Sequence, residues 1–195
     1  MEGQGTVTRI LGISGSLRSK SYNGALLKAG VPLLGAGIEL EIASLHGIPL
    51  YNGDLDVAGG QPNGVQELKA RVLACDGLLL ATPEYNNSIP GVLKNAVDWL
   101  SRPASDIPKV FGNRPVAVIG ASPGGFGTIL AQSAWLPVLR TLGTRPWFGG
   151  RLMVSRAHQV FNEDGEIVEE IVRAQLRDFL NGFARFIQEQ RPPRT

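Results

Sequence analysis

The chain has 195 residues, of which 43% are apolar and 18% charged, and its formal net charge is +2. This length and composition predict one folded domain over residues 1–195, with residues 1–6 and 190–195 as flexible tails. The small charge excess argues against nucleic-acid binding, and a single cysteine excludes an internal disulfide framework or a cysteine metal site. Glycine stands out, with 25 residues.

Short apolar runs alternate with longer segments of helical periodicity. In chain order the pattern predicts strand 7–13, helix 22–34, strand 38–43, loop 44–63, helix 64–75, strand 77–82, helix 90–101, strand 115–121, helix 128–142, strand 151–155 and helix 167–188. The strands are continuously apolar, which is typical of a parallel sheet covered on both faces. Strict alternation therefore predicts an α/β fold with a doubly wound, five-stranded parallel sheet and helices on both faces.

No apolar run is long enough for a membrane span or a secretion signal. We therefore expect a cytoplasmic protein that does not bind membranes. The acidic segment 161–166 lacks the ligand spacing of a calcium loop, so we interpret it as a turn and expect no metal site.

Ligands of doubly wound folds bind beyond the carboxyl ends of the strands, which selects residues 14–23, 82–90 and 121–128. The first of these loops contains four serines, together with Arg18 and Asn23, and it leads into a helix. Helix N-termini, hydroxyl groups and a guanidinium all favour a phosphate group. Walker A and dinucleotide-binding glycine motifs are missing from it, so the loop is predicted to hold a phosphate through hydrogen bonds. The alternative is a serine-rich helix cap with no ligand.

The other two loops are suited to a flat ring. Residues 83–91 contain two prolines, an aromatic residue and two asparagines, while residues 121–127 contain three glycines. Prolines stiffen a loop whose backbone groups can meet the edge of a heterocycle, and glycines allow close approach. Each loop alone also fits an ordinary turn, but together they predict a phosphate on the first loop and a ring between the others.

Three motifs carry a family resemblance: Gly15-Ser16-Leu17-Arg18-x-x-Ser21-x-Asn23, Thr82-Pro83-Glu84-Tyr85-Asn86 and Pro90-Gly91-x-Leu93-Lys94-Asn95-Ala96-x-Asp98-Trp99. In this order they closely resemble the NAD(P)H-dependent FMN reductases with a flavodoxin-like fold, which include quinone, azo-dye and chromate reductases. The resemblance implies strand order 2-1-3-4-5 and an FMN cofactor, with NADPH or NADH as electron donor.

The resemblance also implies the residues that contact FMN. Those in the first loop are Ser16, Leu17, Arg18, Ser21, Tyr22 and Asn23. Those expected around the isoalloxazine and ribityl groups are Pro83, Glu84, Tyr85, Asn86, Ser122, Pro123, Gly124 and Gly125. No catalytic side chain is expected, because the flavin carries the hydride. Glu84 and Tyr85 are candidates for the substrate-facing side; alternatively, Glu84 positions backbone or forms a subunit salt bridge, and Tyr85 is a packed loop aromatic.

The implied function is that of an NAD(P)H-dependent oxidoreductase. It passes hydride to bound FMN and then reduces a quinone, flavin, azo or similar small-molecule acceptor by a ping-pong mechanism. A homodimer or homotetramer is expected, with the helix at residues 90–101 contributing to subunit contacts. The alternatives are a flavodoxin-type electron carrier, which the net charge of +2 disfavours because such carriers are usually strongly acidic, and a flavin-binding redox sensor.

Overall fold

The computed structural model describes residues 7–56 and 60–191. The predicted tails therefore lie mostly outside the described residues. Of the C-terminal tail, Gln190 and Arg191 are described. Arg191 Nη2 donates to the Val7 carbonyl oxygen at 2.9 Å and forms an ion pair with Asp76 at 3.0 Å, so these contacts attach the end of the last helix to the first strand.

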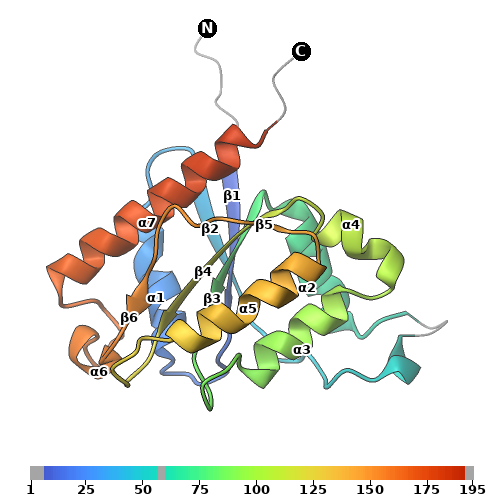
Figure 1. The fold of residues 1–195 in the computed structure, drawn as a ribbon, viewed down its shortest axis with the longest axis horizontal. Helices are drawn as coiled ribbons and strands as arrows, with labels where there is room; N and C mark the ends of the chain where they lie inside the picture. The colour runs from blue at the N-terminus through green and yellow to red at the C-terminus, as the bar shows by residue number, and fades with distance from the viewer. Residues whose placement is uncertain (1–6, 57–59, 192–195) are drawn as a thin grey trace, which may run out of the picture.

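A parallel sheet forms the centre of the molecule (Figure 1). Its strands are β1 (Thr8–Ser14), β2 (Ile38–Ala43), β3 (Gly77–Ala81), β4 (Pro115–Ala121), β5 (Arg145–Pro146) and β6 (Met153–Val154). The order is β2-β1-β3-β4-β5, with β6 also paired to β4, and every pairing is parallel. The predicted α/β fold with order 2-1-3-4-5 is confirmed.

The fifth strand differs from its prediction. It consists of two short segments on the same neighbour: Pro146 is paired with Val116 of β4, and Met153 with Gly120 further along. Residues 147–152 lie opposite only residues 117–119, so the chain bulges away between the two segments. The predicted strand at residues 151–155 contains β6 but misses β5, because two paired residues are too few to produce a sequence pattern.

The five predicted helices are all present, as α1 (Tyr22–Gly30), α2 (Asn63–Ala74), α3 (Gly91–Leu100), α5 (Ile129–Thr141) and α7 (Glu170–Glu189). The first is shorter than predicted, because Pro32 lies in a separate 3-10 turn, η1 (Val31–Leu33). Further short elements were not predicted: η2 (Gly53–Leu55), η3 (Ala104–Asp106), α4 (Ile107–Val110) and α6 (Ala157–Val160).

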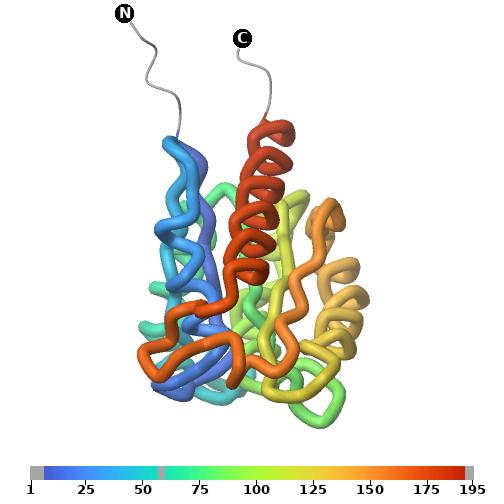
Figure 2. The backbone as a smooth tube through the Cα atoms, turned by 90° about the vertical axis from the view of Figure 1, so that its left-hand side faces the viewer, coloured from blue at the N-terminus to red at the C-terminus, as the bar shows by residue number. Residues whose placement is uncertain are grey.

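The helices form a layer on each face of the sheet. Side chains of α1 and α7 share one apolar core with the strands, and those of α2, α3 and α5 share the other. Figure 2 shows α7 running along its face between the N-terminal segment and the β5–β6 segment. Leu176, Phe179, Leu180 and Phe183 form the buried stripe of α7. Ile171 has the spacing of this stripe, but it lies in the first turn of the helix and is 73% exposed.

The loops that follow β1, β3 and β4 meet at one edge of the sheet, the lower edge in Figure 1. Two buried tryptophans support this edge from the α3 and α5 side. The indole N–H of Trp99 donates to the Pro49 carbonyl oxygen at 2.8 Å, and that of Trp135 donates to Thr82 Oγ1 at 3.1 Å. Both large side chains therefore pack in the core and still satisfy their polar atom. No helix in the described part of the chain has the length and apolar character of a membrane span.

Candidate functional site

The first loop leads from β1 into the N-terminus of α1. Ser21 is the N-cap residue of α1, and its Oγ accepts from the Gly24 N–H at 3.2 Å. Ser14 Oγ and Ser16 Oγ accept from the backbone N–H groups of Ser16 and Arg18, both at 3.4 Å. These two bonds are longer than usual, so the hydroxyls remain able to turn toward a ligand.

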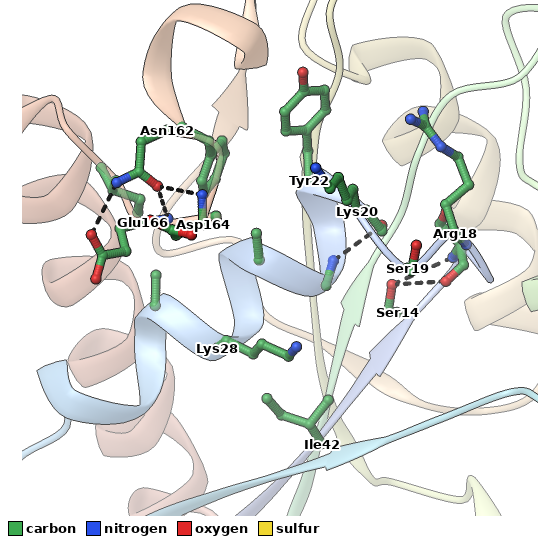
Figure 3. Close-up of a pocket in the computed structure, with 18 of the residues that line it drawn as sticks. Ser14, Arg18, Ser19, Lys20, Tyr22, Lys28, Ile42, Asn162, Asp164 and Glu166 are labelled. Carbon is green, nitrogen blue, oxygen red and sulfur yellow. Dashed lines mark hydrogen bonds between the residues drawn. The ribbon is translucent and has the colours of Figure 1, made fainter.

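The same loop concentrates unused donors. Within residues 7–56 and 60–191, no hydrogen-bond partner is found for the backbone N–H groups of Leu17, Ser19 and Tyr22 or for the Arg18 guanidinium. The first turn of α1 contains no acidic residue. Figure 3 shows the Arg18 side chain extended from the loop. The loop therefore offers a positive potential and free donors, the requirements of an anion site.

A cavity of about 1050 Å³ opens beside this loop. Its lining includes Ser14, Ser16, Arg18 and Ser21 on one side and the turn at residues 162–166 on another. Among the described residues, those of the second and third loops lie outside this cavity, on the adjoining surface. Of the three candidate loops, this cavity therefore borders only the first.

The predicted turn at residues 161–166 is confirmed. Asn162 Oδ1 accepts from the N–H groups of Asp164 and Glu166 (Figure 3). Phe161 and Ile167 pair as an antiparallel bridge. Tyr22, expected near the cofactor, packs its ring against Phe161, with centroids 5.7 Å apart. Among the described residues no group of three or more His, Cys, Asp or Glu could hold a metal ion.

Asn23 joins the first loop to the third. Its side chain is 3% exposed; Nδ2 donates to the Ala121 carbonyl oxygen at 2.9 Å, and Oδ1 accepts from the Ala121 N–H at 3.0 Å. Asn23 was predicted to hold a phosphate. The structure directs its side chain instead to the end of β4, so its visible role is to position the third loop.

The second loop is a tight β-hairpin. The backbone groups of Tyr85 and Ser88 bond to each other in both directions at 3.1 Å, and Asn86 and Asn87 both have positive φ, 50° and 61°. Two consecutive residues with positive φ, flanked by residues that hydrogen-bond to each other, are typical of a type I′ turn, for which asparagine is well suited. The Asn-Asn pair was a usable sequence signal that the prediction of a simple loop missed.

Prolines seat the base of this hairpin against the first loop. Pro83 and Pro90 are buried, whereas Tyr85 is 47% exposed at the hairpin. A Cβ atom at Gly15 would lie 2.8 Å from Pro83 Cδ and 3.0 Å from Pro90 Cγ. The absence of a side chain at Gly15 therefore allows the first and second loops to pack directly together.

Glu84 connects the second loop to α5. Its Oε2 accepts from the backbone N–H groups of Leu130 at 2.8 Å and Ala131 at 3.0 Å, in the first turn of that helix. The carboxylate thus satisfies donors that a helix leaves unpaired at its N-terminus. Of the interpretations given above for Glu84, these contacts favour a role in positioning backbone.

The third loop rests on a segment that sequence reasoning did not connect with the site. Ser122 N–H donates to the Val154 carbonyl oxygen at 2.9 Å, and Arg156 N–H donates to the Gly124 carbonyl oxygen at 3.0 Å. Pro123, Gly124 and Gly125 are exposed, and a Cβ atom at Gly125 would meet nothing within 4 Å. The backbone of this loop is therefore accessible at Gly125, where no side chain covers it.

Cys75 lies outside the site. It is buried and free, at the end of α2, and burial raises the pKa of its thiol while the adjacent Arg114 acts in the opposite direction. A buried, neutral thiol is a poor nucleophile. None of the observations at the site assigns it a chemical role.

Comparisons with known proteins agree with this geometry. Residues 8–159 match the family model described as NADPH-dependent FMN reductase. The chain is 40% identical to an NAD(P)H-dependent FMN reductase of Pseudomonas aeruginosa, over 94% of this chain and 97% of that protein. It is 35% identical to a 2-hydroxy-1,4-benzoquinone reductase of a Burkholderia species, over 94% of this chain and 98% of that protein.

Solved structures give the same result. The flavoenzyme NAD(P)H:(acceptor) oxidoreductase FerB from Paracoccus denitrificans superposes with a TM-score of 0.84 at 33% identity, covering 94% of this chain and 98% of that one. A flavodoxin variant from Pseudomonas aeruginosa, at 18% identity and a TM-score of 0.57, shares the fold. The extent of the family match and the full-length similarity to these relatives show that the chain belongs to the NADPH-dependent FMN reductase family.

Proposed function

We propose that this chain is an NAD(P)H-dependent, FMN-containing oxidoreductase that reduces quinone-type acceptors by a ping-pong mechanism. The family assignment and the relatives described as FMN and quinone reductases support the cofactor, the donor and the acceptor class. When bound, FMN takes a hydride from NAD(P)H and passes the reducing equivalents to a second substrate such as a quinone, flavin or azo compound. The protein's own task is to bind, orient and shield the reactants.

The single observation that carries this proposal is the donor-rich first loop. Backbone N–H groups and an Arg18 side chain that have no partner among the described residues, together with a helix N-terminus without acidic residues, line or border one cavity. A terminal phosphate dianion satisfies these groups, and a guanidinium binds phosphate oxygens in a two-pronged arrangement. We assign Ser16, Arg18 and Ser21 to the FMN phosphate, together with backbone donors of Leu17 and Tyr22.

The ring is proposed to lie between the hairpin and the third loop. Backbone groups of Pro83, Tyr85 and Asn86 border one side of this space, and residues 122–125 border the other. Tyr85 and Phe126, which are 47% and 78% exposed, stand on these loops as apolar surface for a planar acceptor. Asn23 and Glu84 hold the loops in place from behind.

We further propose a homodimer or homotetramer in the cytoplasm. Large exposed apolar side chains on loops at the carboxyl edge, namely Leu50, Tyr85 and Phe126, favour contact between copies. The NAD(P)H donor and the single unpaired thiol favour a reducing compartment. Light scattering at micromolar concentration tests the assembly, and a monomer there would contradict it.

Substitution of Arg18 tests the cofactor site. Arg18→Ala is expected to weaken FMN binding about 10- to 100-fold, the usual effect of losing a charge-assisted hydrogen bond of about 1.5–3 kcal/mol. Riboflavin, which lacks the phosphate, is expected to bind equally well to both proteins. Lys109→Ala removes an equal charge from an exposed position on α4 and serves as control.

Fluorescence titration of flavin-free protein measures both ligands, and oxidation of NADPH and NADH with benzoquinone measures turnover. A purified chain that carries no flavin and binds no added FMN would overturn the proposal. A protein that binds FMN but oxidises neither donor would overturn the enzymatic part and favour a carrier or sensor.

A further inference from the structure

Glu84 acts at a distance from its own loop. It precedes the hairpin turn, but both of its hydrogen bonds go to the first turn of α5, at 2.8 Å to Leu130 N and 3.0 Å to Ala131 N. The N-cap residue of that helix, Thr128, makes no side-chain cap, and the first turn contains no acidic residue. Glu84 therefore supplies the capping that the local sequence of α5 lacks.

A second contact ties the same two elements together. The Trp135 indole, fully buried in α5, donates to Thr82 Oγ1 at 3.1 Å, and Thr82 lies two residues before Glu84. The chain from Thr82 to Glu84 is thus attached to α5 at both ends. Because the third loop ends where α5 begins, these bonds determine how far the hairpin lies from that loop.

The backbone at the start of α5 is strained, so contacts from outside the helix are needed to hold it. Thr128 is fully buried with φ 71°, a left-handed conformation that a β-branched residue rarely adopts. It is preceded by Gly127, also at positive φ, where a Cβ atom would lie 2.7 Å from the Met153 carbonyl oxygen. A backbone held in such a conformation depends on its surroundings, and the bonds from Glu84 begin two residues later.

We propose that Glu84 is a positioning residue for the flavin ring. Its carboxylate, bound to the N-terminus of α5, sets the width of the space between the hairpin and the third loop and does so without contacting the flavin. This inference rests on the proposed function, because it assumes that the isoalloxazine ring occupies that space. The required feature is an acceptor oxygen at this position and reach, since both bonds use the same oxygen atom.

Three variants separate the effects of side-chain length, of the negative charge and of complete loss of the carboxylate at position 84. Glu84→Gln keeps an acceptor oxygen at the same reach, Glu84→Asp keeps the charge but shortens the side chain by one methylene, and Glu84→Ala removes the group. The full-length proteins, freed of flavin, are titrated with FMN and with riboflavin by flavin fluorescence, next to the wild type and Arg18→Ala. Circular dichroism confirms that each variant is folded.

The expected pattern distinguishes the ring from the phosphate. Glu84→Ala and Glu84→Asp should weaken the binding of FMN and of riboflavin by the same factor, about tenfold. The affinities of Glu84→Gln should stay within about threefold of the wild-type values. Arg18→Ala should weaken FMN alone. The visible absorption bands of bound flavin should shift in Glu84→Asp but not in Glu84→Gln. A purely structural role for Glu84 would not produce this difference between the two variants.

Other outcomes overturn the inference. Wild-type affinity for both flavins in Glu84→Ala, or loss confined to FMN, would show that the carboxylate does not set the ring space. If Glu84→Ala fails to fold, Glu84→Asp and Glu84→Gln still decide, and equal affinities in these two would refute the requirement for reach. If the wild type binds neither flavin, the proposed function fails, a result that is separate from any difference among the Glu84 variants.

Discussion

Replacement of Asn23 by alanine is expected to destabilise the protein through two buried hydrogen bonds. The β3–β4 pairing runs as far as the bond from Thr82 N–H to the Ile119 carbonyl oxygen. Beyond that point the Asn23 amide serves Ala121, accepting from its N–H at 3.0 Å and donating to its carbonyl oxygen at 2.9 Å. A side chain from α1 therefore continues the sheet's hydrogen bonding at the base of the third loop.

The magnitude follows from what the variant leaves unpaired. Asn23→Ala leaves the N–H and the carbonyl group of Ala121 without partners, and Ala121 is 2% exposed. Each buried unsatisfied group costs about 1–3 kcal/mol, and entry of water recovers part of that. We expect the free energy of unfolding to fall by about 2–4 kcal/mol and Tm by roughly 4–16 °C in a chain of this size.

Urea unfolding of the flavin-free protein, followed by circular dichroism, measures the effect. Asn63→Ala is the matched control, because Asn63 is exposed at the start of α2. Asn23→Asp tests the donor separately: it keeps an acceptor for the Ala121 N–H but places a carboxylate against the Ala121 carbonyl oxygen, so it should destabilise at least as much. An Asn23→Ala protein within about 0.5 kcal/mol of the control would refute the reasoning.

Two further predictions concern packing and pH. Gly15→Ala should cost about 1–3 kcal/mol of stability and weaken FMN binding, because the added Cβ lies 2.8 Å from Pro83 Cδ. Gly91→Ala is the control and should be neutral, because a Cβ there meets nothing within 4 Å. Thermal unfolding compares the two variants, and equal losses of stability would contradict the predicted clash. Burial raises the pKa of the Cys75 thiol above its value in the unfolded chain, so the unfolded state loses this proton first and stability should decline as the pH rises through the alkaline range. Urea unfolding at about pH 8 and about pH 10 should show a smaller decline in Cys75→Ala than in the wild type, and identical declines would contradict this.

Much of the fold follows from patterns that the sequence carries locally. Apolar runs marked β1, β3 and β4 to within a residue or two, since strands buried on both faces leave few polar positions. The edge strand β2 was also placed correctly, but it alternates instead, with Glu39 and Glu41 exposed. The fifth strand could not be predicted in the same way, because β5 is only two residues long and depends on pairing with β4. Ile171 has the right spacing for a buried stripe, yet it is 73% exposed, so helical spacing alone did not identify the buried residues of α7.

The candidate site, like the fold, could be predicted from the sequence only in part. Residue types at the helix entry were enough to predict the first loop as an anion site, since serine hydroxyls, Arg18 and a helix N-terminus act through chemistry that is local in the chain. The separate roles of Asn23 and Glu84 were not predictable in detail. Their partners, Ala121 and the first turn of α5, lie far along the chain, and only the assembled fold brings them together.

By itself the sequence determined the fold class, the three candidate ligand loops and the family to which the chain belongs, because each depends on composition, periodicity or short motifs. The tertiary structure alone decided how these loops are held. Two polar side chains bind backbone groups 98 and about 46 residues away, and the β6–α6 segment supports the third loop from behind. Hydrogen bonds between distant segments have no periodic signature, so their partners emerge only when the strands have assembled in order.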